Sequence, residues 1–439
     1  MTAISLMTTA QIAALETSAI AALTTADVAS MTSAQLGALT SDQLPVLGTA
    51  NLRVLTSAQL AGFTATQIPT LLDTQVAVLS TAGIKGLTAA AIGALGSDQA
   101  AALSSGQLAA LTTTQLPNLT TTTLAGLTAT GLGGFSSAQI AALSSAAAAA
   151  LTAEQIGGLT TAAVKGFESA EIAAFTSAQL AGFSTAQIAA LGSTQLDDLA
   201  TTQASMLSTA QVAALNAAAV AGLSSGFIGA LDSARVAALS SRQVAALTST
   251  QIDDITTTAI SSLTTSAVKG LGSAQVSALT NAQVGQLTTA QIANMSAGAV
   301  TGLSSADLAT NMSSTQVAAL TTAQLAALSS AQLAGVSTAT VAGLTSAQVG
   351  ALSATAIAGV TTATVAALTT AQVKGLNDKQ LAAMSTGQIA AIGTAAIDDL
   401  STAAIRGLGS VQVDAMTTSQ LGQLTTAQIA QLTTAAIKG

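Results

Sequence analysis

The sequence predicts an all-α repeat fold, a solenoid or superhelix of one-turn helices with one helix per octapeptide. Three observations carry this prediction. A large apolar residue recurs at every eighth position from Met7 to Leu303 and, after one extra residue, from Met312 to Leu432, which makes 54 octads. A helix-capping residue follows it in 50 octads, and glutamine stands three residues after that in 31. A β-solenoid is the alternative, because Thr, Val and Ile suit strands, but it explains neither the glutamine nor the abundant alanine.

Positions 1 and 6 of the octad form two apolar rows. Position 1 is Leu in 39 octads and Met, Phe, Ile or Val in the other 15. Position 6 is Ile, Val or Leu everywhere except Ala100, Ala148 and Ala204. We expect both rows to lie inside the solenoid, with position 7 in solvent because Lys and Arg occur there.

Positions 2 and 5 predict where each helix begins. Position 2 is Thr, Ser, Asn, Asp or Gly except at Glu16, Leu72, Glu168 and Ala200, and those five residue types are the preferred N-caps. Gln at position 5 completes a capping box, in which each side chain bonds a free backbone N–H of the first turn. Positions 1 and 6 then form the residue pair of a hydrophobic staple.

A single continuous helix is excluded by the period. Eight residues at about 100° each advance the helix by roughly 800°, so an apolar row would drift around the surface and form no face. Proline occupies position 7 at Pro45, Pro69 and Pro117, where it lacks the N–H that a longer helix would need. Each helix should therefore be little more than one turn, and Gly or Ala at positions 7 and 8 should let turns approach closely and reverse.

The octads predict one continuous array over residues 1–439, because a solenoid grows by adding units. The extra residue at 303–311 is a slip in the repeat, and we expect a kink or bulge there.

Composition argues against several function classes. Only 10 Lys and Arg stand against 18 Asp and Glu, aromatics are 1%, and Cys and His are absent. Nucleic-acid binding needs clustered basic residues and stacking platforms, and disulfides and thiolate or imidazole metal sites need Cys or His. We expect no nucleic-acid partner, no small-molecule substrate, no cofactor and no enzyme activity. Ser and Thr interrupt every apolar run, so no transmembrane segment is expected, and the N-terminal residues show no signal peptide.

The sequence contains a few candidate site residues, and none is assigned as catalytic, cofactor-binding or metal-binding. Three acidic pairs could hold a hard cation, but they lack the spacing of a calcium loop: Asp197-Asp198, Asp253-Asp254 and Asp398-Asp399. Glu154, Glu168 and Glu171 are close in sequence without the pattern of an acid–base pair, and Lys165 is read as a surface partner of Glu168. Phe167, Phe175 and Phe183 are read as a wider core. Three Asn-x-Ser/Thr matches, at Asn118, Asn294 and Asn311, are expected by chance in a chain so rich in Ser and Thr.

The octad resembles a known repeat. Its cleanest copy is Leu287-Thr-Thr-Ala-Gln-Ile-Ala-Asn294. The octad, as at Leu207–Ala214 with Ser208 and Val212, is similar to the LTTAQIAA-type octapeptide arrays of large bacterial surface and secreted proteins described as adhesin-like. The resemblance covers essentially the whole chain. It implies an extracellular structural protein at the bacterial cell surface and supplies no binding residues.

Three functions follow as hypotheses. The first is a structural protein, the subunit of an extracellular bacterial filament or surface fibre that self-associates end to end, because Ile4 and the octad Leu432–Gly439 are in frame and show no capping repeat. The second is an ice- or surface-binding protein that uses an array of Thr. The third is a protein-binding scaffold, which would need a more varied surface with aromatic and Arg anchors. A stalk segment of a giant adhesin is a variant of the first.

Overall fold

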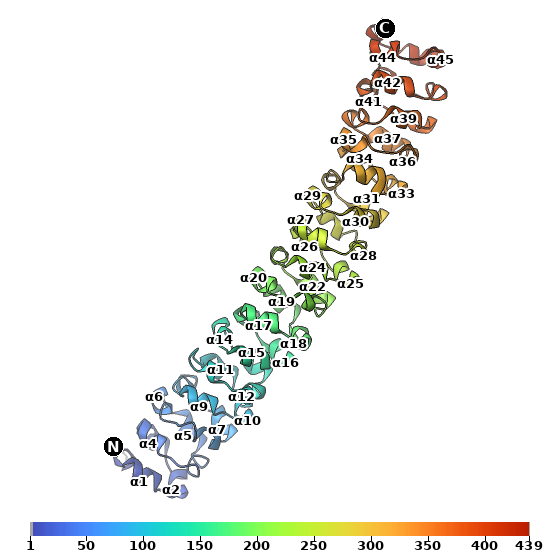
Figure 1. Cartoon of the computed structure of the whole chain (residues 1–439). Helices are drawn as coiled ribbons and strands as arrows, with labels where there is room; N and C mark the ends of the chain where they lie inside the picture. Colours follow the sequence, from blue (N-terminus) through green and yellow to red (C-terminus); the bar gives the residue numbers. More distant parts are fainter. Residues whose placement is uncertain (1–2, 439) are drawn as a thin grey trace. The chain divides into compact units, whose positions relative to one another are not determined.

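The computed structural model describes residues 3–438 (Figure 1). The chain divides into two compact units, Met1–Leu223 and Ser224–Gly439, and the octad frame runs through both. Within residues 3–438 every regular element is a helix of three to six residues and no strand is present. The all-α prediction is confirmed and the β-solenoid alternative is wrong, while one continuous domain over 1–439 stays a prediction.

The α-helices of the first unit lie one to an octad. Their bounds are α1 Thr9–Ala13, α2 Thr17–Ala21, α3 Thr25–Ala29, α4 Ser33–Gly37, α5 Thr49–Arg53, α6 Ser57–Leu60, α7 Asp73–Ala77, α8 Thr81–Ile84, α9 Ala89–Gly93, α10 Ser97–Ala101, α11 Ser105–Ala110, α12 Thr121–Gly126, α13 Ala129–Leu132, α14 Ser137–Ala141, α15 Ser145–Ala150, α16 Ala153–Gly158, α17 Ser169–Ala174, α18 Ser177–Gly182, α19 Thr185–Ala190, α20 Ser193–Asp197, α21 Thr201–Ala204, α22 Thr209–Ala214 and α23 Ala217–Val220.

The α-helices of the second unit follow the same rule. Their bounds are α24 Ser225–Gly229, α25 Ser233–Ala237, α26 Ser241–Ala246, α27 Ser249–Asp254, α28 Thr257–Ile260, α29 Ser273–Ser277, α30 Asn281–Gln286, α31 Thr289–Asn294, α32 Ala297–Val300, α33 Ser314–Ala318, α34 Thr322–Ala327, α35 Ser330–Leu333, α36 Thr338–Ala342, α37 Ser346–Ala351, α38 Ala354–Ile357, α39 Thr362–Ala366, α40 Thr370–Val373, α41 Asp378–Ala383, α42 Thr386–Ala391, α43 Thr402–Ile405, α44 Ser410–Asp414, α45 Thr418–Gln423, α46 Thr426–Ile429 and α47 Thr434–Ile437.

Other octads carry a 3₁₀ or π turn instead of an α turn. The 3₁₀ turns are η1 Ala3–Leu6, η2 Ile68–Thr70, η3 Leu116–Asn118, η4 Ala163–Gly166, η5 Ala267–Gly270 and η7 Thr394–Ala396, and the π turn is η6 Asp307–Asn311. Pro69 and Pro117 lie inside η2 and η3, and Pro45 lies in a turn outside the helices. Proline therefore shortens the turn, as expected from its missing N–H, and leaves the octad in place.

Capping boxes start the helices as predicted. In α31 the Thr288 hydroxyl accepts from the backbone N–H of Gln291 (3.1 Å), and Gln291 Oε1 accepts from the N–H of Thr288 (2.7 Å). Where position 2 lacks a hydroxyl, half of the box persists, because the backbone N–H of Leu72 donates to Gln75 Oε1 at 2.8 Å. Where position 5 lacks a glutamine the other half persists, because the Thr88 hydroxyl accepts from the N–H of Ala91 at 3.1 Å. Either half of the box can therefore start a turn.

The two apolar rows form the core in both units. Leu239 at position 1 is 3% exposed and Val244 at position 6 is fully buried, whereas Ala245 at position 7 is exposed. Inside and outside are therefore assigned correctly by the repeat.

Glutamine at position 5 is buried as well, which the capping role alone does not predict. Gln75 is 1% exposed, and its Nε2 donates to the backbone carbonyls of Leu44 (2.9 Å) and Leu47 (2.7 Å). These residues stand 31 and 28 positions earlier, on the neighbouring superhelical turn. In the second unit Gln283 donates to residues at the same separations, at 3.0 and 2.6 Å. A superhelical turn therefore contains between three and four octads.

We call this set of turn-to-turn bonds the glutamine ladder. Every member keeps its Oε1 on its own helix start and sends Nε2 to the turn before. Its members are Gln35, Gln43, Gln59, Gln67, Gln75, Gln99, Gln107, Gln115, Gln139, Gln155, Gln179, Gln187, Gln195, Gln203 and Gln211 in the first unit and Gln275, Gln283, Gln291, Gln316, Gln324, Gln332, Gln348, Gln372, Gln380, Gln388, Gln412, Gln420 and Gln428 in the second.

The extra residue at 303–311 forms the expected bulge. It is absorbed by η6, where the N–H of Met312 donates to the carbonyl of Asp307, five residues back, at 2.8 Å. The next ladder bonds reach 29 and 32 residues back, as at Gln316, and Gln372 returns to 28 and 31. The slip therefore lengthens one superhelical turn by one residue and leaves the ladder intact.

Glycine at position 8 lets turns approach closely. A Cβ built on Gly86 would lie 1.9 Å from the carbonyl oxygen of Ser57 on the neighbouring turn. No glycine within the described residues has a positive φ. The chain therefore reverses without left-handed glycine, and the glycine is required for space.

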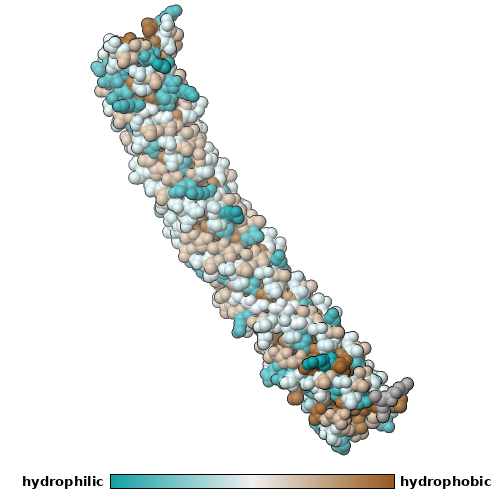
Figure 2. All heavy atoms as spheres, turned by 180° about the vertical axis from the view of Figure 1, so that it is seen from behind, coloured by the Kyte–Doolittle hydropathy of each residue, from teal (hydrophilic) through white to brown (hydrophobic). Residues whose placement is uncertain are grey.

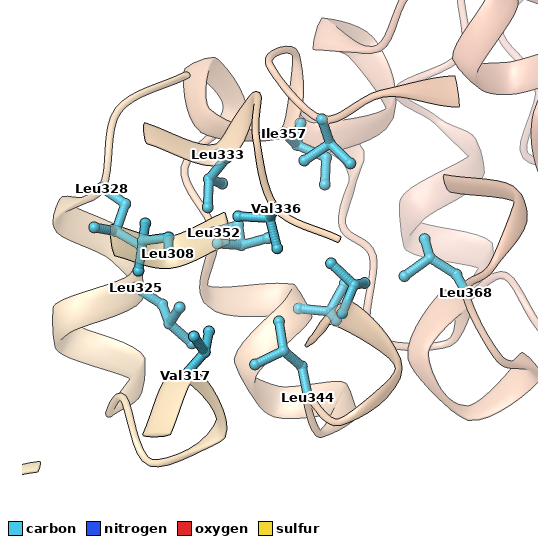
Figure 3. Close-up of a pocket in the computed structure, with 13 residues that line it drawn as sticks. Leu308, Val317, Leu325, Leu328, Leu333, Val336, Leu344, Leu352, Ile357 and Leu368 are labelled. Atoms are coloured by element: carbon cyan, nitrogen blue, oxygen red, sulfur yellow. The ribbon is translucent and has the colours of Figure 1, made fainter. Parts of the chain in front are cut away.

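The core of the second unit contains one small gap of about 20 Å³ (Figure 3). Its lining is aliphatic, and two position-1 valines, Val336 and Val360, contribute to it where most octads have leucine. A water in such a gap would find no polar partners. We read it as a packing defect and not as a ligand site.

The first prediction concerns the ladder. Glu171 occupies position 5 and is 7% exposed, but an ionised carboxylate has no donor for the carbonyls 28 and 31 residues back. Glu171→Gln should raise the free energy of unfolding by about 1 kcal/mol, and Gln283→Glu should lower it by about 1–3 kcal/mol because buried carbonyls lose their donor. Thermal and urea unfolding measure both. Glu154→Gln makes the same charge change on an exposed side chain, and an equal gain there would show that charge alone is responsible.

The second prediction concerns position 8. Gly86→Ala should lower the free energy of unfolding by about 1–3 kcal/mol, because the methyl group would meet backbone that cannot yield. Gly422 lies in α45 with nothing within 4 Å of a built Cβ, so Gly422→Ala should raise it by about 0.5–1 kcal/mol through helix propensity. Urea unfolding compares the two. A loss of similar size at both sites would contradict the close-approach argument.

Candidate functional site

The acidic residues singled out in the sequence do not form a metal cluster. No group of three or more His, Cys, Asp and Glu side chains lies together in residues 3–438. The Oδ2 atom of Asp198 is buried and unpaired, and Asp198 lines a surface groove of about 460 Å³ together with Glu168. The groove brings together two carboxylates, fewer than the three acidic side chains of a recognisable metal group.

The three glutamates have separate structural positions. Glu171 Oε2 accepts from the backbone N–H of Glu168 at 2.7 Å, which is the capping bond that glutamine makes elsewhere. Glu154 is exposed on α16. The arrangement of Glu168 and Glu171 serves the start of α17 and offers no acid–base pair.

The phenylalanine cluster belongs to the core. Phe167 and Phe175 pack edge to face with ring centroids 5.0 Å apart, and Phe183 lies 5.5 Å from Phe175. All three side chains are at most 5% exposed. They fill the interior of the first unit and leave no aromatic platform on its surface.

The Asn-x-Ser/Thr matches place asparagine at octad ends. Asn294 Nδ2 donates to the carbonyl of Ala290 on its own helix, and Asn311 Nδ2 donates to Asp307 Oδ1 at 2.8 Å. Asp307 at position 5 has only acceptor oxygens, and Asn311 supplies a donor to it within the π turn η6.

The outer wall is chemically uniform. The face shown in Figure 2 carries mostly weakly polar and weakly hydrophobic side chains, interrupted by scattered hydrophilic ones. The ion pair between Arg235 and Asp232 is local to α25. None of the helices in residues 3–438 is long and apolar enough to cross a membrane.

Within residues 3–438 no turn stacks before the first superhelical turn; we call this surface the N-face and define it by Met7, Gln11, Leu15 and Leu23. The three position-1 side chains are half-buried, whereas those from Met31 onward to Met416 are buried. Gln11 is exposed; its Oε1 accepts from the N–H of Thr8 at 2.8 Å, and among the described residues no carbonyl accepts from its Nε2. The N-face therefore offers an apolar surface with an unused amide donor.

Asp27 takes the position-5 place two octads after Gln11. Its carboxylate accepts from the Thr24 hydroxyl at 2.7 Å and from the Thr24 N–H at 3.0 Å, and these bonds lower the pKa of Asp27 below its ordinary value. An ionised Asp27 caps its own helix and has no donor to offer. Gln11 is thus the one position-5 amide of the first three octads.

The last superhelical turn presents the opposite surface, which we call the C-face and define by Leu421, Leu424, Ile429, Leu432 and Ile437. The position-6 side chains of Leu421, Ile429 and Ile437 are 41%, 48% and 62% exposed. Gln420 and Gln428 are each 1% exposed because their Nε2 atoms already bond the turn before. Within the described residues, the carbonyls of Leu424 and Leu432 receive no side-chain donor.

The two faces carry complementary groups. The N-face exposes position 1 and a free donor, while the C-face exposes position 6 and free acceptors. These are the two halves of the contact that every turn makes with the next. Another turn of the same octad carries the groups that match each face, and the sequence indicates these surfaces only through the in-frame ends.

Comparison with known proteins supports the repeat. Six stretches match the family model described as the ALTTAQ repeat, at residues 12–49, 72–105, 130–161, 164–201, 357–394 and 389–426. No curated protein matches the chain. The adhesin-like context implied by the resemblance stays an expectation. These six stretches are similar to the ALTTAQ repeat and support a repeat array.

Proposed function

We propose that this chain is a structural protein, the subunit of an extracellular bacterial filament or surface fibre that assembles head to tail. The observation that carries the proposal is the complementarity of the N-face and the C-face. Each is one side of a contact that recurs throughout both units. A contact between two different faces of the same molecule propagates as a filament unless it closes into a ring.

The composition of the wall supports the same role. A net charge of −8 over 439 residues provides little repulsion between copies. Ten Lys and Arg residues also give trypsin-like proteases few sites. Such a surface suits a component whose task is to extend and persist, and the bacterial cell-surface location comes from the resemblance of the octad.

The same complementarity would operate inside a longer polypeptide. If the array continues beyond these residues, as in a stalk of a giant adhesin, the adjoining octads would cover both faces. The structural role is then unchanged, and the turns on the two sides of each face belong to one polypeptide instead of two molecules.

An array of Thr for binding ice or another surface is less well supported. The position-2 hydroxyls accept hydrogen bonds from the helix starts, as Thr288 does from Gln291. Neighbouring turns are offset by 28 and 31 residues, which are not multiples of eight. Equivalent threonines of successive turns therefore do not stand directly above one another.

The third prediction tests assembly. The isolated 439-residue chain should scatter light increasingly as its concentration rises, and electron microscopy should show particles several times longer than one chain, because each docking buries two apolar faces. Dilution should reverse the association. A chain that sediments as a monomer over the micromolar to millimolar range would rule out end-to-end assembly.

A further inference from the structure

We infer that docking between copies is directional and is specified by Gln11, whose amide extends the glutamine ladder of one copy onto the C-face of a second copy of this chain. The inference rests on the proposed function and adds the residues that form the junction and set its polarity. The candidate occupant is a second copy because the junction continues a contact already repeated within each unit.

The ladder has a fixed chemical direction. In every rung the amide donor stands later in the chain and the carbonyl acceptors stand earlier, as for Gln43 Nε2 with Ile12 (3.0 Å) and Leu15 (2.8 Å). The N-face therefore has a donor whose ladder acceptors are missing, and the C-face has carbonyl acceptors whose ladder donors are missing. Two C-faces would place carbonyl against carbonyl, and two N-faces would leave the C-face carbonyls without donors. The N-face of one copy on the C-face of another is the arrangement that continues the ladder.

The register follows from the residues before Met7. Ile4 already fills the position-6 place of an octad, since Gln35 Nε2 donates to its carbonyl at 3.1 Å and to that of Met7 at 2.8 Å. In the docked pair, the octad that contains Ile4 of one copy takes the place of the octad after Leu432–Gly439 of the other copy. With the interior separations of 28 and 31 residues, Gln11 of the docked copy then meets the carbonyls of Leu424 and Leu421. These two residues are three apart, like the acceptors of Gln43 and Gln75.

The position-1 carbonyl of Leu424 gains this donor at the junction. Leu47 in the interior lies between two turns, and its carbonyl accepts from Gln75 and not from a backbone N–H. Leu424 has the same place in its octad. Docking without an amide would remove its carbonyl from water and leave it unpaired, which is unfavourable.

The experiment measures association of the full chain by sedimentation and light scattering. Gln11→Glu keeps the capping oxygen and removes the donor, and Gln286→Glu makes the same charge change on an exposed side chain of the wall. We expect Gln11→Glu to raise the concentration for half-assembly about tenfold or more, the factor that an unpaired buried carbonyl implies. Gln286→Glu should match the unmodified chain.

A second pair of variants tests the apolar part of the junction. Ile429→Asp places a charge on the C-face, and Val46→Asp places one on the wall, where Val46 is 38% exposed. Ile429→Asp should abolish association, while Val46→Asp should leave it within about twofold of the unmodified chain. Both residues are exposed, so circular dichroism should show unchanged helix content in all four variants.

Orientation is read from single cysteines, because the chain has none. Ala10→Cys near the N-face and Ala435→Cys near the C-face, carrying donor and acceptor dyes respectively, should show energy transfer on mixing. A mixture in which both the donor dye and the acceptor dye are attached to Ala10→Cys chains should show much less energy transfer. Equal transfer in the two mixtures, or a Gln11→Glu variant that assembles like the unmodified chain, would overturn the inference while leaving filament formation standing. An unmodified chain that never associates would instead remove the proposed function.

Discussion

The bond from a position-5 amide to a carbonyl one superhelical turn earlier is the constraint on which the remaining structure depends. One-turn helices separated by extended residues leave the position-1 carbonyl outside every backbone hydrogen bond, and burying it unpaired would be costly. Gln75 shows the solution: one side chain caps its own helix through Oε1 and satisfies Leu47 on the turn before through Nε2. Local helix initiation and stacking of turns thus use the same residue.

Sequence reasoning predicted the parts of the fold that are local. The eight-residue period, the capping residues and the prolines at position 7 define where each turn starts and stops, and the structure agrees at α31 and at η2. The turn-to-turn bonds were missed, because no short window shows what lies 28 residues away. The signal that could have revealed them is the choice of amide. A capping box accepts Glu as readily as Gln, yet position 5 is Gln in 31 octads and Glu only at Glu171.

The slip and the glycines show how the ladder limits variation. An extra residue at 303–311 is tolerated because η6 absorbs it within one turn, and Asn311 supplies Asp307 with a local donor. The repeat predicts that Gly or Ala at positions 7 and 8 lets turns approach closely, and Gly86 confirms this by admitting the backbone of Ser57. That contact joins octads three apart, which local conformation cannot indicate.

The candidate site follows from the same direction of bonding. A repeat whose donors always lie later in the chain cannot satisfy its first donor or its last acceptors from within. The N-face with Gln11 and the C-face with Leu424 are therefore consequences of the ladder and do not require a specialised binding sequence. Charged and aromatic anchors usually identify a docking surface. The two faces are defined without such anchors, because each face is one side of an ordinary turn. In the head-to-tail assembly that we propose, each face recognises a copy of the repeat and needs no residue that differs from it, so the uniformity of the wall and the chemistry of the ends would have one physical cause.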